Sequence, residues 1–370
     1  MRYYLTAGEA SGDLHGSNLI RGLRQADPDA VFRFFGGDMM AAAAEQEPVV
    51  HYREGAVMGP SDILAKAGKL LRNLSLCKKD ISDWKPDAVI LIDYPGFNMR
   101  IARYCHARGI RVFYYIPPKT WASREGRNRQ LKEWVDIVFI VFPFEAEYFR
   151  QAGVPFVFKG NPLPDAIANH EFRRPCEGRY IAVLPGSRKS EISRTLPVCM
   201  EAAGELGMKV LVAGAPARSI EDYAPWIEGH PEAEVMFNRT YDILKYADAA
   251  IINSGTASLE AALIGTPQVV CWSASALTWW YANHILKVGD HIPFISLGNL
   301  CLGREAFREL LQDDFNSNAV REEVSRLLDD APYRERMLAD YEIIRESMGG
   351  AGASAAVARA MIDEIKSNTI

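Results

Sequence analysis

The sequence predicts an α/β protein with two doubly wound domains that face a central cleft. The first observation behind this prediction is that short apolar runs alternate with amphipathic helical stretches along nearly all 370 residues, as in βαβ units with parallel sheets. The second is that runs such as Ala88–Ile92 are apolar throughout, as expected of strands covered on both faces. The third is that the pattern runs twice, in a chain too long for one compact core.

The alternation assigns the elements in chain order. The expected strands of the first half are Tyr3–Thr6, Val31–Gly36, Ala88–Asp93, Val112–Ile116, Ile137–Phe142 and Phe156–Lys159. Those of the second half are Tyr180–Leu184, Lys209–Ala213, Ala233–Phe237, Ala249–Asn253 and Gln268–Trp272. The clearest helices are Ser61–Trp84, Asn98–Arg108, Phe144–Gln151, Ser193–Leu206 and Thr256–Ile264.

The periodicity breaks near Gly160–Gly178, where prolines, glycines and polar residues replace it. We therefore expect a Rossmann-like domain over residues 1–165 and a second over residues 175–345. Residues 346–370 are expected to hold a separate helix that packs back on the first domain or is exchanged between subunits, so a homodimer is possible. The carboxyl ends of both sheets would border the cleft.

The composition is that of an ordinary globular protein. With 48% hydrophobic and 24% charged residues, it excludes a disordered chain or a coiled coil. The net charge of −5 argues against a nucleic-acid partner. The six cysteines form no C-x-x-C pair, and no apolar run approaches about 18 residues. We expect a cytoplasmic protein, either soluble or peripheral on a membrane.

The loop after the first strand brings two carboxylates, Glu9 and Asp13, to the start of a helix. Ser11 and Gly12 lie between them, and the glycines of this loop lack the G-x-G-x-x-G spacing of a dinucleotide site. We interpret the loop as a polar wall of the cleft. The alternative is a tight turn in which Ser11 or Asp13 only caps the helix.

Asp93 follows an apolar strand and precedes Tyr94-Pro95-Gly96-Phe97-Asn98. A carboxylate at that strand end has one apolar side, an arrangement that raises its pKa toward the range of a general base. The alternative is that Asp93 caps the helix that Pro95 and Asn98 help to start. Capping and catalysis share this geometry, so both interpretations stay open.

The helix expected over Ser61–Trp84 mixes basic and apolar residues. Its basic residues are Lys66, Lys69, Arg72, Lys78 and Lys79, and its leucines are Leu64, Leu70, Leu71, Leu74 and Leu76. The stretch Lys119–Lys132 adds further basic residues beside Trp121. Such a mixture suits an anionic membrane surface or a phosphorylated lipid. A solvated helix face is the alternative.

The loop after the first strand of the second half contains Gly186, Ser187 and Arg188. Gly186 allows a close approach of the backbone, Ser187 can bind a phosphate oxygen, and the Arg188 guanidinium can contact it with two N–H groups. This combination indicates phosphate binding. The alternative is a solvated turn.

A second loop of that half, Asn253–Ala262, is the strongest local signal. Ser254, Gly255 and Thr256 follow a strand and open a helix of small residues, whose N-terminus can bind a diphosphate. Glu260 lies one turn further on the same face, where it can accept hydrogen bonds from ribose hydroxyls. The alternative is that Glu260 only interacts with the helix dipole and binds no ribose. Together with Arg188, the loop predicts a nucleotide-diphosphate site.

Metal chemistry finds little support. The seven histidines show no H-x₃-H or H-E-x-x-H spacing, and no paired Asp motif indicates a metal-held diphosphate. We therefore predict neither metal nor cofactor, with Arg188 and helix N-termini neutralising the leaving group.

Several of these runs resemble the lipid A disaccharide synthase family. They are Ala-Gly-Glu-Ala-Ser-Gly-Asp (7–13), Phe-Gly-Gly-Asp-Met-Met (35–40), Ile-Asp-Tyr-Pro-Gly-Phe-Asn (92–98), Phe-Pro-Phe-Glu (142–145), Leu-Pro-Gly-Ser-Arg (184–188), Glu-Ile (191–192), Ser-Gly-Thr-Ala-Ser-Leu-Glu (254–260) and Ser-Leu-Gly-Asn-Leu (296–300). They occur in the family's order from Ala7 to about Leu311 and are specific jointly.

The resemblance implies a GT-B architecture and an inverting, metal-independent glycosyl transfer at the inner face of the cytoplasmic membrane. The donor would be UDP-2,3-diacylglucosamine and the acceptor 2,3-diacylglucosamine 1-phosphate (lipid X), joined by a β-1,6 link with release of UDP. It makes Asp93 the candidate base and places Glu9 and Asp13 on the acceptor side. It has Arg188, Ser254, Thr256 and Glu260 hold UDP, with Asn299 nearby.

The chain departs from the family pattern at three places. Pro117–Ser123 stands where the family usually has Ser-Pro-Gln-Val-Trp-Ala-Trp, Asn161 stands for a histidine, and Asp62 stands for a glutamate. None touches the UDP motifs, so they bear on substrate detail.

Three rival functions are considered. One is a non-catalytic nucleotide-binding module, which would leave Asp93 and Glu9 in the cleft without a role. A UDP-sugar 2-epimerase shares the scaffold and the UDP pocket but would need an acid–base pair around the sugar C2. A nicotinamide-dependent oxidoreductase is disfavoured because the G-x-G-x-x-G fingerprint is absent.

Overall fold

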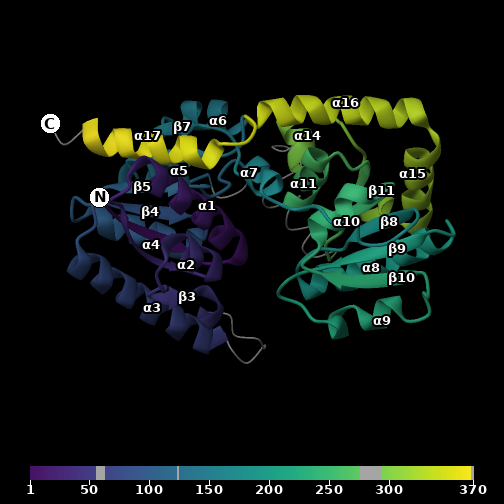
Figure 1. Cartoon of the computed structure of the whole chain (residues 1–370), viewed down its shortest axis with the longest axis horizontal. Helices are drawn as coiled ribbons and strands as arrows, with labels where there is room; N and C mark the ends of the chain where they lie inside the picture. Colours follow the sequence, from purple (N-terminus) through teal and green to yellow (C-terminus); the bar gives the residue numbers. More distant parts are fainter. Residues whose placement is uncertain (56–62, 123–124, 276–292, 368–370) are drawn as a thin grey trace. The chain divides into compact units, whose positions relative to one another are not determined.

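The structure is a computed structural model that describes residues 1–55, 63–122, 125–275 and 293–367. The chain divides into two compact units, the first made of Met1–Ala168 with Met348–Ile370 and the second of Asn169–Ser347. Each unit has a parallel β-sheet with helices packed on it (Figure 1).

The first unit contains a seven-stranded sheet in the order β3-β2-β1-β4-β5-β6-β7. Its strands are β1 Arg2–Ala7, β2 Val31–Gly36, β3 Val50–His51, β4 Ala88–Ile92, β5 Val112–Tyr115, β6 Ile137–Ile140 and β7 Phe156–Phe158. Its helices are α1 Ala10–Ala26, α2 Asp38–Ala44, the 3-10 helix η1 Tyr52–Gly55, α3 Ile63–Trp84, α4 Pro95–His106, α5 Arg127–Trp134, α6 Glu145–Ala152, α7 Leu163–Ala168 and α17 Ala353–Ser367.

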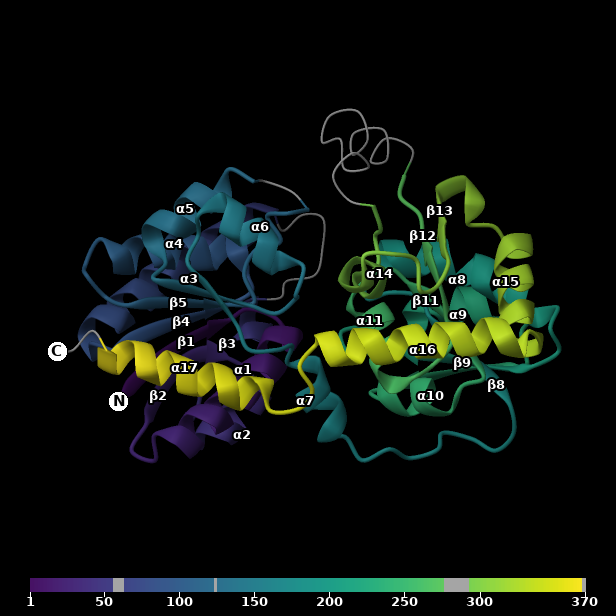
Figure 2. The ribbon, with the colours of Figure 1, turned by 90° about the horizontal axis from the view of Figure 1, so that it is seen from above.

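Helices α3, α4 and α5 cover one face of this sheet, and α1, α2 and α17 cover the other (Figure 2). Alternate strand residues such as Val89 and Leu91 pack against Ile81 of α3 and Ile101 of α4 in one buried cluster. Because both faces are covered, every residue of β4 is buried, as its apolar sequence predicts.

The last helix, α17, returns to the first unit and lies along α1 (Figure 2). The helices approach so closely at Gly22 that a Cβ there would lie 3.0 Å from the Cα of Ala355. The carboxylate of Asp165 accepts hydrogen bonds from the backbone N–H groups of Gly352 and, at 2.8 Å, Ser354. A small-residue contact therefore holds α17 on α1, and the Asp165 cap ties the start of α17 to α7.

The second unit contains a six-stranded sheet in the order β10-β9-β8-β11-β12-β13. Its strands are β8 Tyr180–Leu184, β9 Lys209–Gly214, β10 Ala233–Phe237, β11 Ala249–Asn253, β12 Gln268–Trp272 and β13 Glu309–Leu311. Its helices are α8 Lys189–Gly204, the 3-10 helix η3 Ile220–Asp222, α9 Ala224–Ile227, α10 Thr240–Tyr246, α11 Thr256–Ile264, α14 Leu297–Leu302, the 3-10 helix η4 Gln312–Asp314, α15 Ser317–Asp329 and α16 Ala331–Ser347.

Every predicted strand is present, with ends that differ by at most two residues. Two edge strands, β3 and β13, were not predicted, because their two and three residues are too few to show a pattern. Helix α8 begins four residues before its predicted start, at Lys189, because Glu191 caps it. The predicted start of α3 at Ser61 lies outside the described residues.

Candidate functional site

The carboxyl ends of β4 and β5 carry an unusual backbone. Asp93, Tyr94 and Ile116 have φ of 46°, 45° and 60°, in the left-handed region that non-glycine residues avoid. The prediction that Asp93 continues the strand is therefore wrong by one residue. Asp93 is held by its own N–H, which donates to the Tyr115 carbonyl at 3.2 Å, and by the Tyr114 hydroxyl, which donates to the Asp93 carbonyl at 2.7 Å. Such strain is typical of functional sites.

The Asp93 carboxylate is half-buried at this edge. Burial raises its pKa, while the positive charge of Lys119 and the Tyr94 backbone N–H act in the opposite direction. A carboxylate with a raised pKa beside a cation fits a general base that is ionised near neutral pH.

Glycine at position 8 is required by the ring of Tyr94. A Cβ on Gly8 would lie 2.4 Å from that ring, so no other residue fits. Burial, followed by the charge of Glu9, raises the pKa of Tyr94, which places Glu9 close to this ring. Glu9 and Ser11 are exposed. Glu9, Tyr94 and Asp93 thus gather at the same edge of the sheet.

Asp13 has a different environment from Glu9. It is only 2% exposed, and its carboxylate accepts hydrogen bonds from the backbone N–H groups of Gly37, Met39 and Met40 at 2.8, 3.1 and 3.0 Å. These bonds cap the N-terminus of α2. Both oxygens are engaged inside the protein, so the geometry favours a positioning role for Asp13.

Replacing Asp13 with Ala is expected to lower the free energy of unfolding by about 3 kcal/mol, because it leaves two buried N–H donors and a partly buried one without an acceptor. Urea-induced unfolding, followed by circular dichroism, measures the change. Asp29→Ala, at an exposed loop position of the same unit, is the matched control and should change stability by less than about 0.5 kcal/mol. An Asp13→Ala protein of normal stability but without activity would instead support a catalytic Asp13.

Asn98 is also buried and bound within the protein. Its Oδ1 accepts a hydrogen bond from the Thr6 hydroxyl at 2.7 Å, and its Nδ2 donates to the carbonyls of Ile92 and Asp93 at 3.1 and 2.8 Å. Asn98 therefore joins the ends of β1 and β4 below Asp93. This geometry favours positioning of the base over the predicted contact with the acceptor. Gly12, another predicted acceptor residue, is buried against Ala7.

In the predicted phosphate loop of the second unit, Glu191 binds N–H groups that a phosphate could otherwise use. Gly186 has φ of 104°, and a Cβ there would lie 2.5 Å from Asn253 Nδ2. The backbone N–H groups of Ser187 and Arg188 donate to Glu191 Oε2 at 3.0 and 3.1 Å. The Arg188 guanidinium pairs with Glu191 Oε1 at 2.7 Å, yet 79% of its side chain is exposed. Among the described residues, the ion pair of Arg188 is with Glu191, three positions further along the chain.

The N-terminus of α11 offers a more open anion site. Gly255 has φ of 147° and is the N-cap residue of the helix, so the cap position carries no side chain. Ser254 is partly buried and Thr256 is exposed beside it. Helix N–H groups without a cap and a positive dipole end can bind a phosphate group. The predicted residues Ser254, Gly255 and Thr256 are brought together here.

Glu260 lies one turn into α11, where it accepts a hydrogen bond from the Tyr241 hydroxyl at 3.1 Å. Burial raises its pKa, and the Tyr241 hydrogen bond opposes this rise. Asn299 of α14, in contrast, is fully buried. Its amide donates to the Phe307 carbonyl and the Glu309 carboxylate, and its Oδ1 accepts the Ala306 N–H at 2.8 Å. This geometry favours a structural role for Asn299 over the predicted proximity to UDP.

Helix α3 presents a mixed surface. Leu71 and Leu76 are 63% and 39% exposed, and Arg72 is exposed beside them. Lys69 is partly buried, and Lys66 lies in the first turns of the helix. Exposed leucines next to basic residues fit the predicted contact with an anionic amphiphile.

Lys119 and Glu145, which the sequence did not indicate as catalytic or UDP-binding residues, belong to the surroundings of Asp93 through the charge of Lys119, which acts on both acids. Lys119 follows β5 and acts on the charge of Asp93, and Glu145 begins α6 after β6. Glu145 is 1% exposed, and its carboxylate accepts hydrogen bonds from the Trp121 indole at 3.1 Å and from the N–H groups of Val141 and Phe142. Burial raises its pKa to about 7. The run Phe-Pro-Phe-Glu can be read from the sequence, but the burial of Glu145 cannot.

The departures from the family pattern are also seen in part. Trp121, in the Pro117–Ser123 run, packs edge-on against Phe144 with ring centroids 4.9 Å apart. Ser123 and Asp62 lie outside the described residues. Asn161 is buried, and it donates to the Val141 carbonyl and accepts from the Leu163 N–H, each at 2.9 Å. It therefore stabilises the turn into α7.

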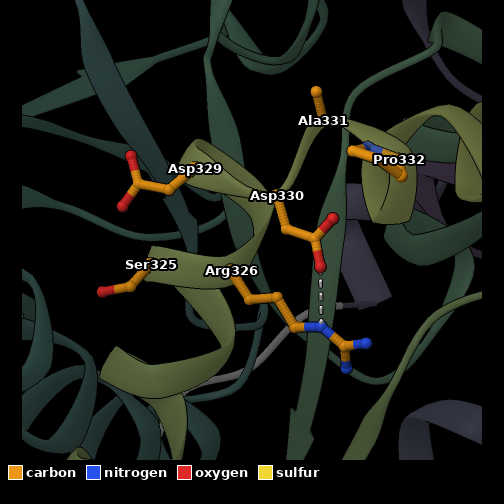
Figure 3. A pocket seen from close by; sticks show the side chains of 6 residues that line it. All are labelled: Ser325, Arg326, Asp329, Asp330, Ala331 and Pro332. Carbon is orange, nitrogen blue, oxygen red and sulfur yellow. Dashed lines mark ion pairs between the residues drawn. The ribbon is translucent and has the colours of Figure 1, made fainter.

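Other features carry no part of this site. A pocket of about 620 Å³ lies at the turn between α15 and α16, where Arg326 and Asp330 form an ion pair of 3.6 Å (Figure 3). None of its lining residues is a predicted site residue. Among the described residues, no cluster of three or more His, Cys, Asp or Glu side chains could hold a metal ion. The described helices include none that is both long and apolar enough to cross a bilayer.

Sequence comparisons give a consistent result. A family model described as lipid-A-disaccharide synthetase matches residues 3–349. The chain is 36% identical over 379 residues to the lipid-A-disaccharide synthase of Trichlorobacter lovleyi, covering 99% of this chain and 98% of the relative. It is 36% identical over 376 residues to that of Geobacter metallireducens, covering 98% and 97%.

Solved structures share the fold at low sequence identity. The UDP-GlcNAc 2-epimerase of Neisseria meningitidis, solved with UDP-GlcNAc, has a TM-score of 0.72 at 11% identity and covers 98% of this chain and 100% of its own. MurG of Acinetobacter baumannii has a TM-score of 0.56 at 12% identity, with coverage of 98% and 100%. The predicted fold class, two parallel-sheet α/β units of the GT-B type, is confirmed.

Proposed function

Because the chain belongs to the lipid-A-disaccharide synthase family, we propose how its residues divide the reaction of that family between the two units. The chain is a glycosyltransferase of lipid A biosynthesis, which uses a UDP-sugar and an acceptor of the lipid X type. The second unit holds the UDP of the donor, and the first unit holds the acceptor and the base. The donor is UDP-2,3-diacylglucosamine, and the acceptor is 2,3-diacylglucosamine 1-phosphate.

The glycine at the N-cap of α11, which leaves the cap position without a side chain, is the observation that carries the donor assignment. The diphosphate binds at Gly255 and Thr256, where the helix dipole favours negative charge. Arg188 leaves Glu191 and pairs with the diphosphate, with Ser187 and Gly186 beside it. Glu260 accepts hydrogen bonds from the ribose hydroxyls.

The strained end of β4 supports the acceptor assignment. Asp93 accepts the proton of the acceptor 6-hydroxyl as the oxygen attacks the anomeric carbon of the donor. The bond between this carbon and the diphosphate oxygen breaks, and UDP leaves with the electron pair, so the configuration inverts. Arg188 and the α11 N-terminus stabilise the negative charge that develops on UDP. Glu9 lines the acceptor side of the site. Asp13 and Asn98 hold the loops of that side in place.

Product formation tests this function directly. Purified protein is incubated with UDP-2,3-diacylglucosamine and lipid X, and the disaccharide and UDP are measured. A UDP-sugar 2-epimerase would instead convert UDP-N-acetylglucosamine alone to its 2-epimer. The exposed leucines of α3 favour a lipid-handling enzyme over this rival. Epimer formation without disaccharide would overturn the proposal.

We also propose that the enzyme acts on the inner face of the cytoplasmic membrane, because its substrates are acylated and α3 exposes leucines beside basic residues. Exchange of α17 between two copies of the chain stays a prediction, since α17 packs on α1 of its own chain in this structure. The molar mass in solution, measured by light scattering, distinguishes a monomer from a dimer.

Charge reversal on α3 tests the membrane contact. The double substitution Leu71→Glu and Arg72→Glu is expected to weaken binding to vesicles that contain phosphatidylglycerol by about tenfold, since it removes apolar area and inverts a charge. Sedimentation with vesicles measures the bound fraction. Arg336→Glu with Ile343→Glu makes the same change on exposed positions of α16 and should leave binding unaltered. Equal binding of wild type and the α3 variant would exclude α3 as the contact.

A further inference from the structure

One oxygen of the Glu260 carboxylate is bound by Tyr241, which is not among the predicted site residues. Tyr241, the second residue of α10, donates its hydroxyl to Glu260 Oε1 at 3.1 Å. Helix α10 packs against α11, which carries Glu260. Among the described residues, no other side chain or backbone group donates a hydrogen bond to the Glu260 carboxylate. One oxygen is therefore fixed, and the other can accept from a ligand.

Tyr241 is itself held in place. Its ring packs edge-on against the imidazole of His170, with centroids 5.3 Å apart at 78°. His170 Nε2 lies 2.9 Å from Oδ1 of Asp242, the residue after Tyr241. Asp242 is buried and also accepts from Arg239 Nε at 3.0 Å. His170, Arg239 and Asp242, but not Tyr241, line a pocket of about 480 Å³ at the start of α10.

The protonation states of Tyr241 and Glu260 suit a hydrogen-bond donor and a hydrogen-bond acceptor. Burial, and then the charge of Glu260, raises the pKa of Tyr241, so the phenol stays protonated and donates. Burial raises the pKa of Glu260, and the Tyr241 hydrogen bond is the influence that lowers it. The hydroxyl therefore both orients the carboxylate and favours its ionised form.

We propose that Tyr241 is a positioning residue for the donor nucleotide, which holds Oε1 of Glu260 so that Oε2 faces the ribose hydroxyls and selects a ribonucleotide over its 2′-deoxy analogue. This inference rests on the proposed function, in which Glu260 binds the ribose. A carboxylate oxygen can accept two hydrogen bonds, and a rigid acceptor gains more from them than a mobile one. Removal of the 2′-hydroxyl then leaves a buried acceptor partly unsatisfied.

Calorimetric titration with UDP and 2′-deoxy-UDP tests the inference. Wild type is expected to bind UDP about tenfold more tightly than 2′-deoxy-UDP. In Tyr241→Phe this preference should fall to about twofold, and the Kd for UDP should rise about fivefold. The KM for the donor should rise together with the Kd for UDP, and more than kcat falls, because the hydroxyl acts on donor binding.

Two further variants separate the possible outcomes. Tyr246→Phe removes a hydroxyl from the same helix and should keep the tenfold preference. Glu260→Gln should abolish the preference. A general loosening of α11 would weaken both nucleotides equally and leave their ratio unchanged, so an unchanged ratio in Tyr241→Phe overturns the inference.

The failure of the inference and the failure of the proposed function give different results. If Glu260→Gln loses the preference but Tyr241→Phe retains it, the ribose assignment stands and the role of Tyr241 is wrong. If Glu260→Gln retains the preference, the ribose assignment fails and the inference fails with it. Thermal unfolding of each variant shows whether the fold is intact, and removal of one hydroxyl leaves the Tyr241 ring packed on His170.

Discussion

Replacing Asp93 with Asn is expected to lower kcat by about 100-fold to 10,000-fold, because an amide cannot accept the proton of the acceptor hydroxyl. The Kd for UDP should stay within about twofold of wild type, since the nucleotide is assigned to the other unit. The amide keeps the size of the carboxylate, so the left-handed backbone at Asp93 has no new reason to relax. Turnover of the two acylated substrates and calorimetric binding of UDP measure the two quantities.

The controls for Asp93 separate chemistry from folding. Asp29→Asn makes the same chemical change at an exposed loop of the same unit and should leave kcat unaltered. Asp93→Ala, which also removes volume, should be no more active than Asp93→Asn. Turnover near the wild-type rate in Asp93→Asn would remove Asp93 from the mechanism and leave Glu9 as the nearest candidate.

The same base predicts the pH profile. A protonated Asp93 cannot accept a proton, so kcat/KM should fall as the pH falls through its pKa, which burial raises. Lys119 opposes that rise, so Lys119→Gln should move the acidic limb to higher pH, whereas Lys132→Gln should not. Glu145 also has a raised pKa, of about 7. An acidic limb that persists in Glu145→Gln and still moves in Lys119→Gln belongs to Asp93, the other acid on which Lys119 acts.

Arg188→Ala is expected to lower kcat/KM by about 100-fold to 1,000-fold, because it removes a charge that stabilises the departing UDP. The Kd for UDP should rise as well, since the same guanidinium contacts the bound diphosphate. The pairing with Glu191 reduces the net gain, because the diphosphate replaces a partner that Arg188 already has. Steady-state kinetics with the donor varied and UDP titration measure both effects.

Two substitutions sharpen the test of Arg188. Arg194→Ala removes an exposed arginine from the same helix and should be nearly neutral. Arg188→Lys keeps the charge but loses the two-pronged contact, so it should recover only part of the activity. Equal kcat/KM for Arg188→Ala and Arg194→Ala would mean that another group neutralises UDP.

The sequence alone was sufficient for the fold class and for most element positions. Uniformly apolar runs such as Ala88–Ile92 predicted strands covered on both faces, because only parallel strands between helix layers bury every residue. The Ser254–Thr256 turn was predicted because small and polar residues stand there between an apolar strand and a helix. Loop chemistry at strand ends follows from the order of residues along the chain, which is local information.

What a carboxylate or an amide does at such a strand end was decided by the tertiary structure. Glu9 and Asp13 look alike in sequence, but only Asp13 lies beneath the N-terminus of α2 and receives three N–H groups. The side-chain amides of Asn98 and Asn299 likewise form hydrogen bonds inside the protein, with Thr6 and Phe307. Tyr241 reaches Glu260 from nineteen positions away along the chain. Hydrogen bonds between residues far apart in sequence depend on how the helices pack, and no local pattern encodes that packing.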